Sequence, residues 1–234
     1  MKTLDDYLTA VKAGQRRFEN AYQSVARMTL DGDDKIEKII VNGKMMYDFK
    51  VFRRGSKHAI AMYEVINSLV SFVKDAAEGG SSSEMAFVLV GEPGNGKTFL
   101  AELLCSAYRQ FLSLPENRKY TFKFTNLKDL GGFGNIPEAE SQTYEDPMIL
   151  AMNLFETKND NQKFLSAQGF IDKQIEALYK NYRPLGACSS YILNKITERT
   201  NGNFQDICQQ HLQIVPVPVS ETLGTITGKY SAKD

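Results

Sequence analysis

Gly91-Glu92-Pro93-Gly94-Asn95-Gly96-Lys97-Thr98 is the segment from which the predicted fold of this chain follows. It fits the pattern G-x-x-x-x-G-K-[ST], in which the backbone N–H groups of a glycine-rich loop surround phosphate oxygens. The apolar residues 85–90 before it predict a short buried strand, and residues 99–108 after it have the apolar spacing of a helix. A strand, a glycine loop and a helix N-terminus in this order predict a phosphate-binding P-loop.

The residue types in this loop suit a nucleotide triphosphate. Glycine lets the backbone approach a phosphate closely, Lys97 can reach the β and γ phosphates, and Thr98 offers a hydroxyl to Mg²⁺. We therefore expect ATP and Mg²⁺ as ligands, with Thr98 as the metal ligand. The predicted nucleotide-binding residues are Gly91, Glu92, Pro93, Gly94, Asn95, Gly96, Lys97, Thr98 and Phe99.

The composition of the 234 residues limits the partners that we expect. Lys+Arg and Asp+Glu both total 28, so the net charge is zero, and neither nucleic acid nor an acidic membrane is a predicted partner. The sequence shows no membrane-spanning run and no signal peptide. Cys105, Cys188 and Cys208 are odd in number and widely spaced, which predicts reduced thiols and a cytoplasmic protein. His58 and His211 stand alone, and we expect neither to be catalytic.

The remaining sequence predicts helices around a sheet. The expected elements are two short helices in residues 3–30, a hairpin of 36–41 and 44–50 around Asn42-Gly43, a helix over 58–78, a second strand over 120–125, mostly helix over 146–200 and an edge strand over 211–219. The predicted fold is α/β, an AAA-type P-loop NTPase with a parallel sheet flanked by helices. Residues 1–50 are expected to form a small helical and hairpin segment, and residues 51–234 the nucleotide-binding domain.

Two loops allow more than one interpretation. The basic window of residues 50–58 is typical of a solvated loop, but it could also lie near the nucleotide or at a subunit boundary. Within it, Ser56 fits a short basic-directed phosphorylation pattern. The glycine-rich residues 129–137 read as a surface loop, whereas in an AAA-type ring Phe133 could line a central pore.

A second element that P-loop ATPases need is missing from the sequence. ATP hydrolysis requires an apolar strand that ends in Asp or Asp-Glu, and Phe170-Ile171-Asp172 is too short to be that strand. No arginine after residue 199 stands in the context of an arginine finger. We therefore predict no catalytic residue, and we expect either a piece of a longer protein, which we favour, or a module that only binds nucleotide.

Taken together, these residues resemble the AAA domain at the N-terminus of PrkA-type bacterial serine protein kinases. The resemblance covers residues 45–234, and only the P-loop is sharply specific. It is carried by 72–79, 91–98, Glu145-Asp146-Pro147, 213–218 and 224–229. In that family the acidic strand lies beyond the point where this chain ends, followed by a C-terminal half with kinase-like function. The domain over residues 51–234 would then be incomplete at its C-terminus.

The resemblance implies the Mg-ATP-binding domain of a PrkA-like serine protein kinase. Its partners would be ATP and a protein substrate, a homo-oligomer stays open, and this chain alone would bind ATP but hydrolyse little of it. Only Gly91, Gly94, Gly96, Lys97 and Thr98 carry over as nucleotide ligands. The alternative is an ATP-gated AAA-type remodelling or interaction module without protein phosphotransfer. A small-molecule P-loop kinase is a third interpretation, opposed by the lack of an Arg-rich lid after residue 145.

Overall fold

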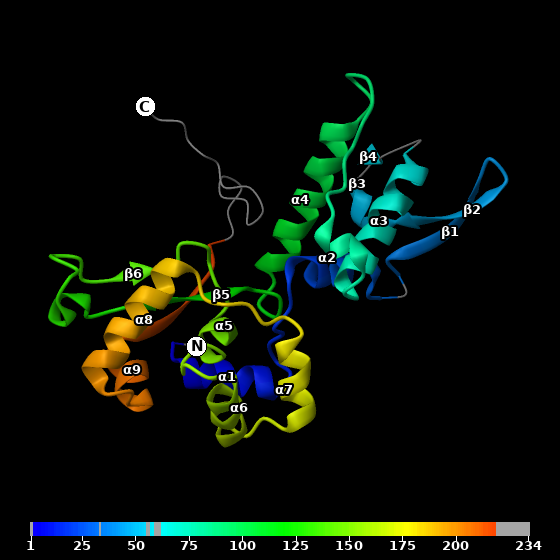
Figure 1. Cartoon of the computed structure of the whole chain (residues 1–234). Coiled ribbons are helices and arrows are strands. Elements are labelled where there is room, and N and C mark those ends of the chain that lie inside the picture. The colour runs from blue at the N-terminus through cyan, green and yellow to red at the C-terminus, as the bar shows by residue number, and fades with distance from the viewer. Residues whose placement is uncertain (1, 33, 55–56, 59–61, 219–234) are drawn as a thin grey trace. The chain divides into compact units, whose positions relative to one another are not determined.

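The computed structural model describes residues 2–32, 34–54, 57–58 and 62–218, which form two compact units. Unit 1 combines the residues up to Phe18 with Pro115–Val217, and unit 2 centres on Glu19–Leu114. Figure 1 labels the helices and most of the strands of both units, which are described here one at a time. These units are defined by packing within the chain. The domains expected from sequence, residues 1–50 and 51–234, stay a prediction.

Unit 1 packs helices against a small antiparallel sheet. Its strands are β5 (Tyr120–Phe124), β6 (Ala139–Glu140) and β7 (Leu212–Pro216), in the order β6-β5-β7. Its helices are α1 (Leu4–Lys12), α5 (Pro147–Ala151), α6 (Lys158–Ala167), α7 (Asp172–Tyr179), α8 (Ala187–Thr200) and α9 (Phe204–Gln210), with a 3-10 turn η3 (Leu127–Leu130). Phe122 and Phe124 of β5 are fully buried in the core with Leu8 of α1 and Leu150 of α5. The sheet therefore has one face covered by helices.

Local sequence explains where the first helix begins. The Thr3 hydroxyl accepts a hydrogen bond from the Asp6 N–H, and the Asp6 carboxylate accepts one from the Thr3 N–H, so that α1 begins with a capping box. Asn20 and Gln23 form the same reciprocal pair at the start of α2 (Ala21–Leu30) in unit 2. The two short helices predicted in residues 3–30 are confirmed.

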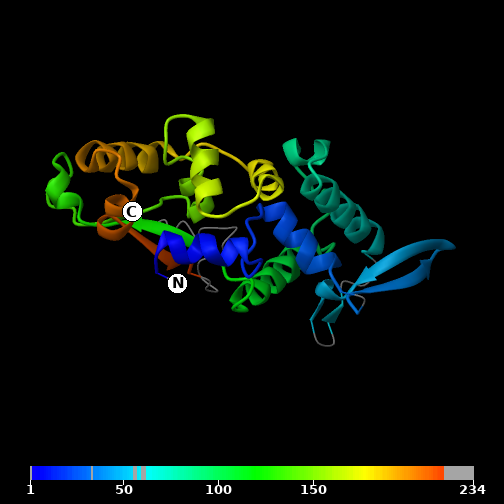
Figure 2. The ribbon, with the colours of Figure 1, turned by 90° about the horizontal axis from the view of Figure 1, so that it is seen from below.

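Unit 2 consists of helices and short hairpins. Besides α2 it contains β1 (Ile36–Val41), β2 (Lys44–Phe49), η1 (Lys50–Phe52), β3 (Arg53–Arg54), β4 (Lys57–His58), α3 (Tyr63–Ala77), η2 (Ser81–Glu84) and α4 (Lys97–Ser113). Figure 2 shows the β1–β2 hairpin projecting from the helices of this unit. Asn42 and Gly43 both have positive φ, 49° and 75°, as a two-residue turn of type I′ requires. The hairpin predicted around these two residues is confirmed.

The predicted parallel sheet, and with it the AAA-type P-loop NTPase fold, is wrong. Every strand pair in the described part of the chain is antiparallel, in sheets of two, two and three strands. The second strand was predicted correctly as β5, but its neighbours are β6 and β7 in antiparallel register. Alternating apolar residues identify a strand without specifying the direction of its partner, because both kinds of ladder bury the same face.

Residues 85–90, predicted as the buried strand before the P-loop, belong to no sheet in the described chain. Phe87 and Leu89 point inward: the Phe87 ring centroid lies 5.4 Å from that of Phe72 on α3, and Leu89 packs on the apolar cluster around Ile66. Val88 and Val90 are 70% and 88% exposed. The segment therefore buries only the side that carries Phe87 and Leu89. Its apolar sequence resembles that of a buried strand, although Val88 and Val90 on the other side are exposed.

The structure also bears on the predicted edge strand, on the loop with Phe133 and on the helix over 58–78. Two further predicted segments lie outside the described residues. The edge strand is confirmed as β7, which pairs only with β5 among the described strands. Phe133 packs on the unit 1 core, with its ring centroid 6.0 Å from that of Tyr191 on α8. The helix over 58–78 is observed as α3 from Tyr63. Ser56 and residues 224–229, which were part of the resemblance, lie outside the described residues.

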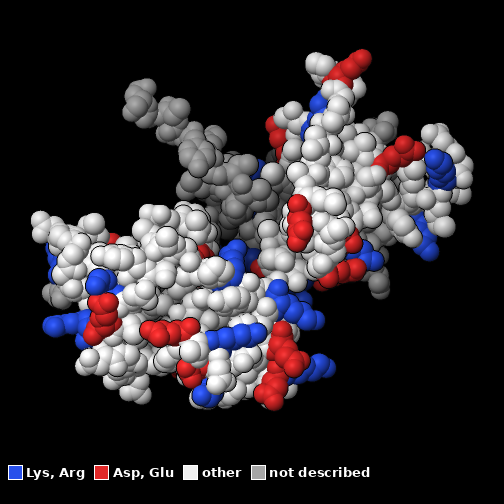
Figure 3. All heavy atoms as spheres, viewed as in Figure 1, with Lys and Arg blue, Asp and Glu red and all other residues white. Residues whose placement is uncertain are grey.

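Both signs of charge are interspersed on the surface. Figure 3 shows Lys and Arg side chains alternating with Asp and Glu side chains on the face that it draws. This mixture accords with equal numbers of acidic and basic residues in the sequence. No helix in the part of the chain that is described combines the length and the apolar character needed to cross a bilayer.

Candidate phosphate-binding loop

The predicted loop, residues 91–98, lies at the start of α4 in unit 2, where Figure 1 shows it at the upper end of that helix. Gly94 and Gly96 have φ of 89° and 74°, in the left-handed region that favours glycine. A Cβ atom on Gly96 would in addition lie 3.1 Å from the Met62 sulfur. The backbone course therefore depends on glycine at two of the positions that the motif specifies.

The first turn of α4 presents backbone donors to solvent. Gly96 is the N-cap residue, and its carbonyl accepts the first helical hydrogen bond from Leu100 N–H at 2.9 Å. Glycine has no side chain with which to cap the helix, so the N–H groups of the first turn keep their capacity to bind an anion. The 17 residues of α4 make it long enough for a full helix dipole, whose positive end lies at this loop.

Lys97 folds back over the loop that precedes it. Its ammonium donates hydrogen bonds to the Gly91 carbonyl at 2.7 Å and to the Glu92 carbonyl at 2.6 Å. These two bonds draw the first residues of the loop toward its last residue and place a positive charge within it. An ammonium has three donors, so one remains for a ligand oxygen while both carbonyls stay bound.

The other predicted residues fall into two groups. Glu92, Pro93, Asn95 and Thr98 are exposed. Phe99 packs its ring on the apolar cluster of unit 2, so only its backbone N–H is in position to serve a ligand. The structure thus brings the loop backbone, Lys97 and Thr98 together, and it assigns Phe99 an anchoring contact.

The histidine and cysteine side chains that sequence analysis considered have the following surroundings. Among the described residues, no three or more His, Cys, Asp or Glu side chains are grouped to hold a metal ion. His211 is buried in unit 1, with its Nδ1 atom 3.1 Å from the Thr125 carbonyl. The three cysteines are free, as predicted, and burial raises the pKa of the Cys208 thiol to about 12.

Two neighbouring carboxylates of unit 1 were not singled out as polar centres by sequence reasoning. Glu145 is buried and accepts hydrogen bonds from the hydroxyls of Ser141 and Ser189, at 2.9 and 2.5 Å, and from the Gly186 N–H at 2.6 Å. It thereby joins the chain before α5 to the start of α8. Nothing in the local letters indicates this role, because the donors come from distant segments.

The second carboxylate, Asp146, caps α5. Its Oδ1 atom accepts from the Met148 N–H at 2.8 Å and from the Tyr7 hydroxyl at 2.7 Å. Burial raises the pKa of Asp146, while the Tyr7 and Met148 donors oppose that rise. Burial also raises the pKa of Tyr7, well above its ordinary value, so the phenol stays protonated as the donor. Only the turn that starts at Asp146-Pro147 could be read from sequence.

Comparisons of the chain with protein-family models, with curated proteins and with solved structures gave no match. The assignment of a function therefore rests on the loop itself.

Proposed function

We propose that residues 91–98 bind the phosphates of ATP together with Mg²⁺. The observation that carries the proposal is the position of the Lys97 ammonium, held by the Gly91 and Glu92 carbonyls in front of an α-helix whose N-terminus has no capping side chain. A cation, exposed backbone donors and a helix N-terminus are the groups that stabilise a polyphosphate. Thr98 would complete the site as the protein ligand of Mg²⁺.

This binding element needs neither the parallel sheet nor an acidic strand. The donors that face a phosphate belong to the loop and to the first turn of α4, and both are held by packing inside unit 2. Phe99 and Leu100 anchor the helix start in the apolar cluster that includes Ile66 of α3. We therefore propose that this chain alone binds ATP and hydrolyses little of it.

The wider role that we propose is the nucleotide-binding part of a PrkA-like serine protein kinase in the cytoplasm. The support for it is the resemblance of residues 45–234 to that family, and the free state of the three cysteines supports a reducing compartment. Transfer of radiolabel from γ-labelled ATP to serine of a protein, measured with the intact protein, tests this role. ATP-driven ring assembly without any labelled protein would instead favour a remodelling module.

Calorimetric titration of the chain with Mg-ATP tests the binding proposal directly. Lys97→Ala removes a charge-assisted contact worth about 1.5–3 kcal/mol, so we expect the affinity to fall by about 10–150-fold. Thr98→Ala should leave binding of ATP without metal unchanged and abolish the gain that Mg²⁺ produces. Lys44→Ala, at an exposed position beside the hairpin turn, is the matched control and should bind like the native chain.

Two outcomes would contradict the proposal. One is a Lys97→Ala variant that keeps the native affinity while circular dichroism shows an intact fold. The other is a native chain that does not bind Mg-ATP at all. Inorganic tripolyphosphate as a second ligand separates the contributions, because binding as tight as that of ATP would show that the loop recognises phosphates and that the nucleoside adds nothing.

A further inference from the structure

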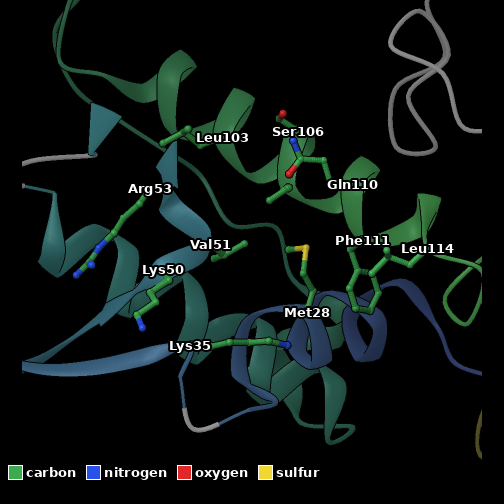
Figure 4. Close-up of a pocket in the computed structure, with 11 residues that line it drawn as sticks. Met28, Lys35, Lys50, Val51, Arg53, Leu103, Ser106, Gln110, Phe111 and Leu114 are labelled. Atoms are coloured by element: carbon green, nitrogen blue, oxygen red, sulfur yellow. The ribbon is translucent and has the colours of Figure 1, made fainter. Parts of the chain in front are cut away.

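A pocket of about 440 Å³ lies in unit 2 on the side of α4, within the range typical of small-molecule sites. Its apolar wall is formed by Met28 of α2, Val51 of η1, and Leu103 and Phe111 of α4. Figure 4 shows the side chains of Met28, Val51 and Phe111 directed toward the space between these three elements. The pocket therefore offers a continuous apolar surface that is open to a ligand.

The opposite wall of this pocket is cationic. Lys35, Lys50 and Arg53 line it, and none of the described lining residues is acidic. In Figure 4 Lys35 and Lys50 lie on the side of the space away from α4, with their ammonium groups directed apart, and Arg53 directs its guanidinium toward the hairpin. There Arg53 pairs with Glu37 and Asp48, so its charge is already neutralised.

The two lysines are held more weakly than Arg53. The Lys50 ammonium lies 3.6 Å from a Glu37 carboxylate oxygen, and both side chains are about half exposed. The Lys35 ammonium lies 3.5 Å from the Arg27 carbonyl, at the outer limit of a hydrogen bond. The exposed Lys50–Glu37 pair contributes little free energy, so a ligand anion can replace the carboxylate. The pocket thus combines apolar walls with two cations available to an anion.

We propose that this pocket binds an anionic amphiphile of small size, in the manner of a medium-chain carboxylate. The apolar part would lie against Met28, Val51 and Phe111, and the carboxylate would pair with the ammonium of Lys35 or of Lys50. Charge complementarity selects the anion, since a cationic amphiphile would meet two lysines and no lining acid. This site is distinct from residues 91–98 of the phosphate loop.

Calorimetric titration of the full chain with decanoate tests the proposal. We expect saturable binding to one site, with affinity rising by up to about fourfold per methylene along the series from octanoate to dodecanoate until the pocket is filled. Decyltrimethylammonium, the cationic counterpart, should bind at least tenfold more weakly. Sodium chloride should weaken the binding of decanoate, since its contact with lysine is ionic.

Variants locate the binding. Lys35→Gln or Lys50→Gln should weaken decanoate by about 3–10-fold, whereas Lys38→Gln, an exposed lysine of β1 that does not line the pocket, should have no effect. Ala107→Phe places a ring in the space from α4 and should abolish binding while thermal unfolding shows a folded protein. Lys97→Ala should leave decanoate binding intact, which distinguishes this site from the phosphate loop.

The proposal is overturned if decanoate does not bind, or if folded Ala107→Phe and both lysine variants bind it like the native chain. Equal affinity for decanoate and decyltrimethylammonium would also overturn it, because apolar burial alone would then account for the binding.

Discussion

At the scale of single residues, the Tyr7–Asp146 pair makes stability depend on pH. The pKa of Asp146 is raised, chiefly by burial, so the folded state favours its protonated form relative to the unfolded chain. The contribution of this group to stability is fully present below the unfolded pKa, about 3.9, and is lost as the pH rises through the folded value. Asp146→Asn keeps an oxygen acceptor for Tyr7 and Met148 and does not titrate.

We therefore expect the thermal unfolding temperature of Asp146→Asn, measured relative to the native chain, to rise between pH 4 and pH 7. Scanning calorimetry over this pH range measures the difference. Asp172→Asn, which removes an exposed carboxylate in the first turn of α7, is the comparison variant for the same change of residue type. A difference that stays constant with pH, or that falls as the pH rises, would show that the carboxyl group is not stabilised in its protonated form.

The form of the candidate loop could be predicted because the pattern that indicates it lies in consecutive residues. Positive φ at Gly94 and Gly96 and the proximity of Lys97 to the loop follow from eight consecutive letters. The partners of Glu145 could not be predicted in this way, because Ser189 and Gly186 reach it only through the packing of α8. The two lysines of the pocket were not predicted either, because the pocket forms only when α2, η1 and α4 pack together. In the sequence, Lys50 belongs to the basic window of residues 50–58, which is typical of a solvated loop.

At the scale of elements, residues 85–90 separate the observed fold from the predicted one. Both faces of a buried parallel sheet are covered by other elements, so Val88 would be buried on whichever face it lay. Truncating it would then cost several kcal/mol. Here Val88 is 70% exposed, whereas Leu89 packs on the apolar cluster. We expect Val88→Ala to change the free energy of unfolding by less than about 0.5 kcal/mol and Leu89→Ala to reduce it by about 1–2 kcal/mol.

Urea denaturation of the two variants measures this contrast, with each serving as the control of the other. A loss for Val88→Ala as large as that for Leu89→Ala would mean that a second layer covers this segment, contrary to the described structure.

Elements were predictable where their determinants are close in sequence. The Asn42-Gly43 turn specifies its hairpin, and the Thr3 and Asn20 caps specify where two helices begin. The sheet of unit 1 is different, since it joins Tyr120 to Pro216 and Phe124 to Leu212 across most of that unit. Such pairing depends on how the intervening helices pack, and no short pattern encodes it.

At the scale of the whole molecule, each apolar cluster falls within one unit. Leu8 belongs to the core of unit 1, and Leu112 packs with Val25 and Tyr108 in unit 2. Both leucines are buried, and truncating either should cost about 2–5 kcal/mol. We expect Leu8→Ala to accelerate amide exchange in α1, α5 and β7, and Leu112→Ala to accelerate it in α2 and α4.

Hydrogen exchange followed by mass spectrometry resolves the two effects on peptides of each unit. Acceleration that is equal over both units in both variants would show a single cooperative structure. Acceleration confined to the unit that carries the substitution would show that the units open separately.

The two hydrogen bonds of Lys97 also have a thermodynamic consequence for binding. A lysine side chain loses up to about 2 kcal/mol of rotamer entropy when it is fixed, and the Gly91 and Glu92 carbonyls fix this one in the free chain. That loss belongs to folding, so a ligand that meets the third donor of the ammonium does not incur it again. Weakening the two carbonyl contacts would leave the charge in place and still lower the affinity, because the flexible side chain would have to be ordered during binding.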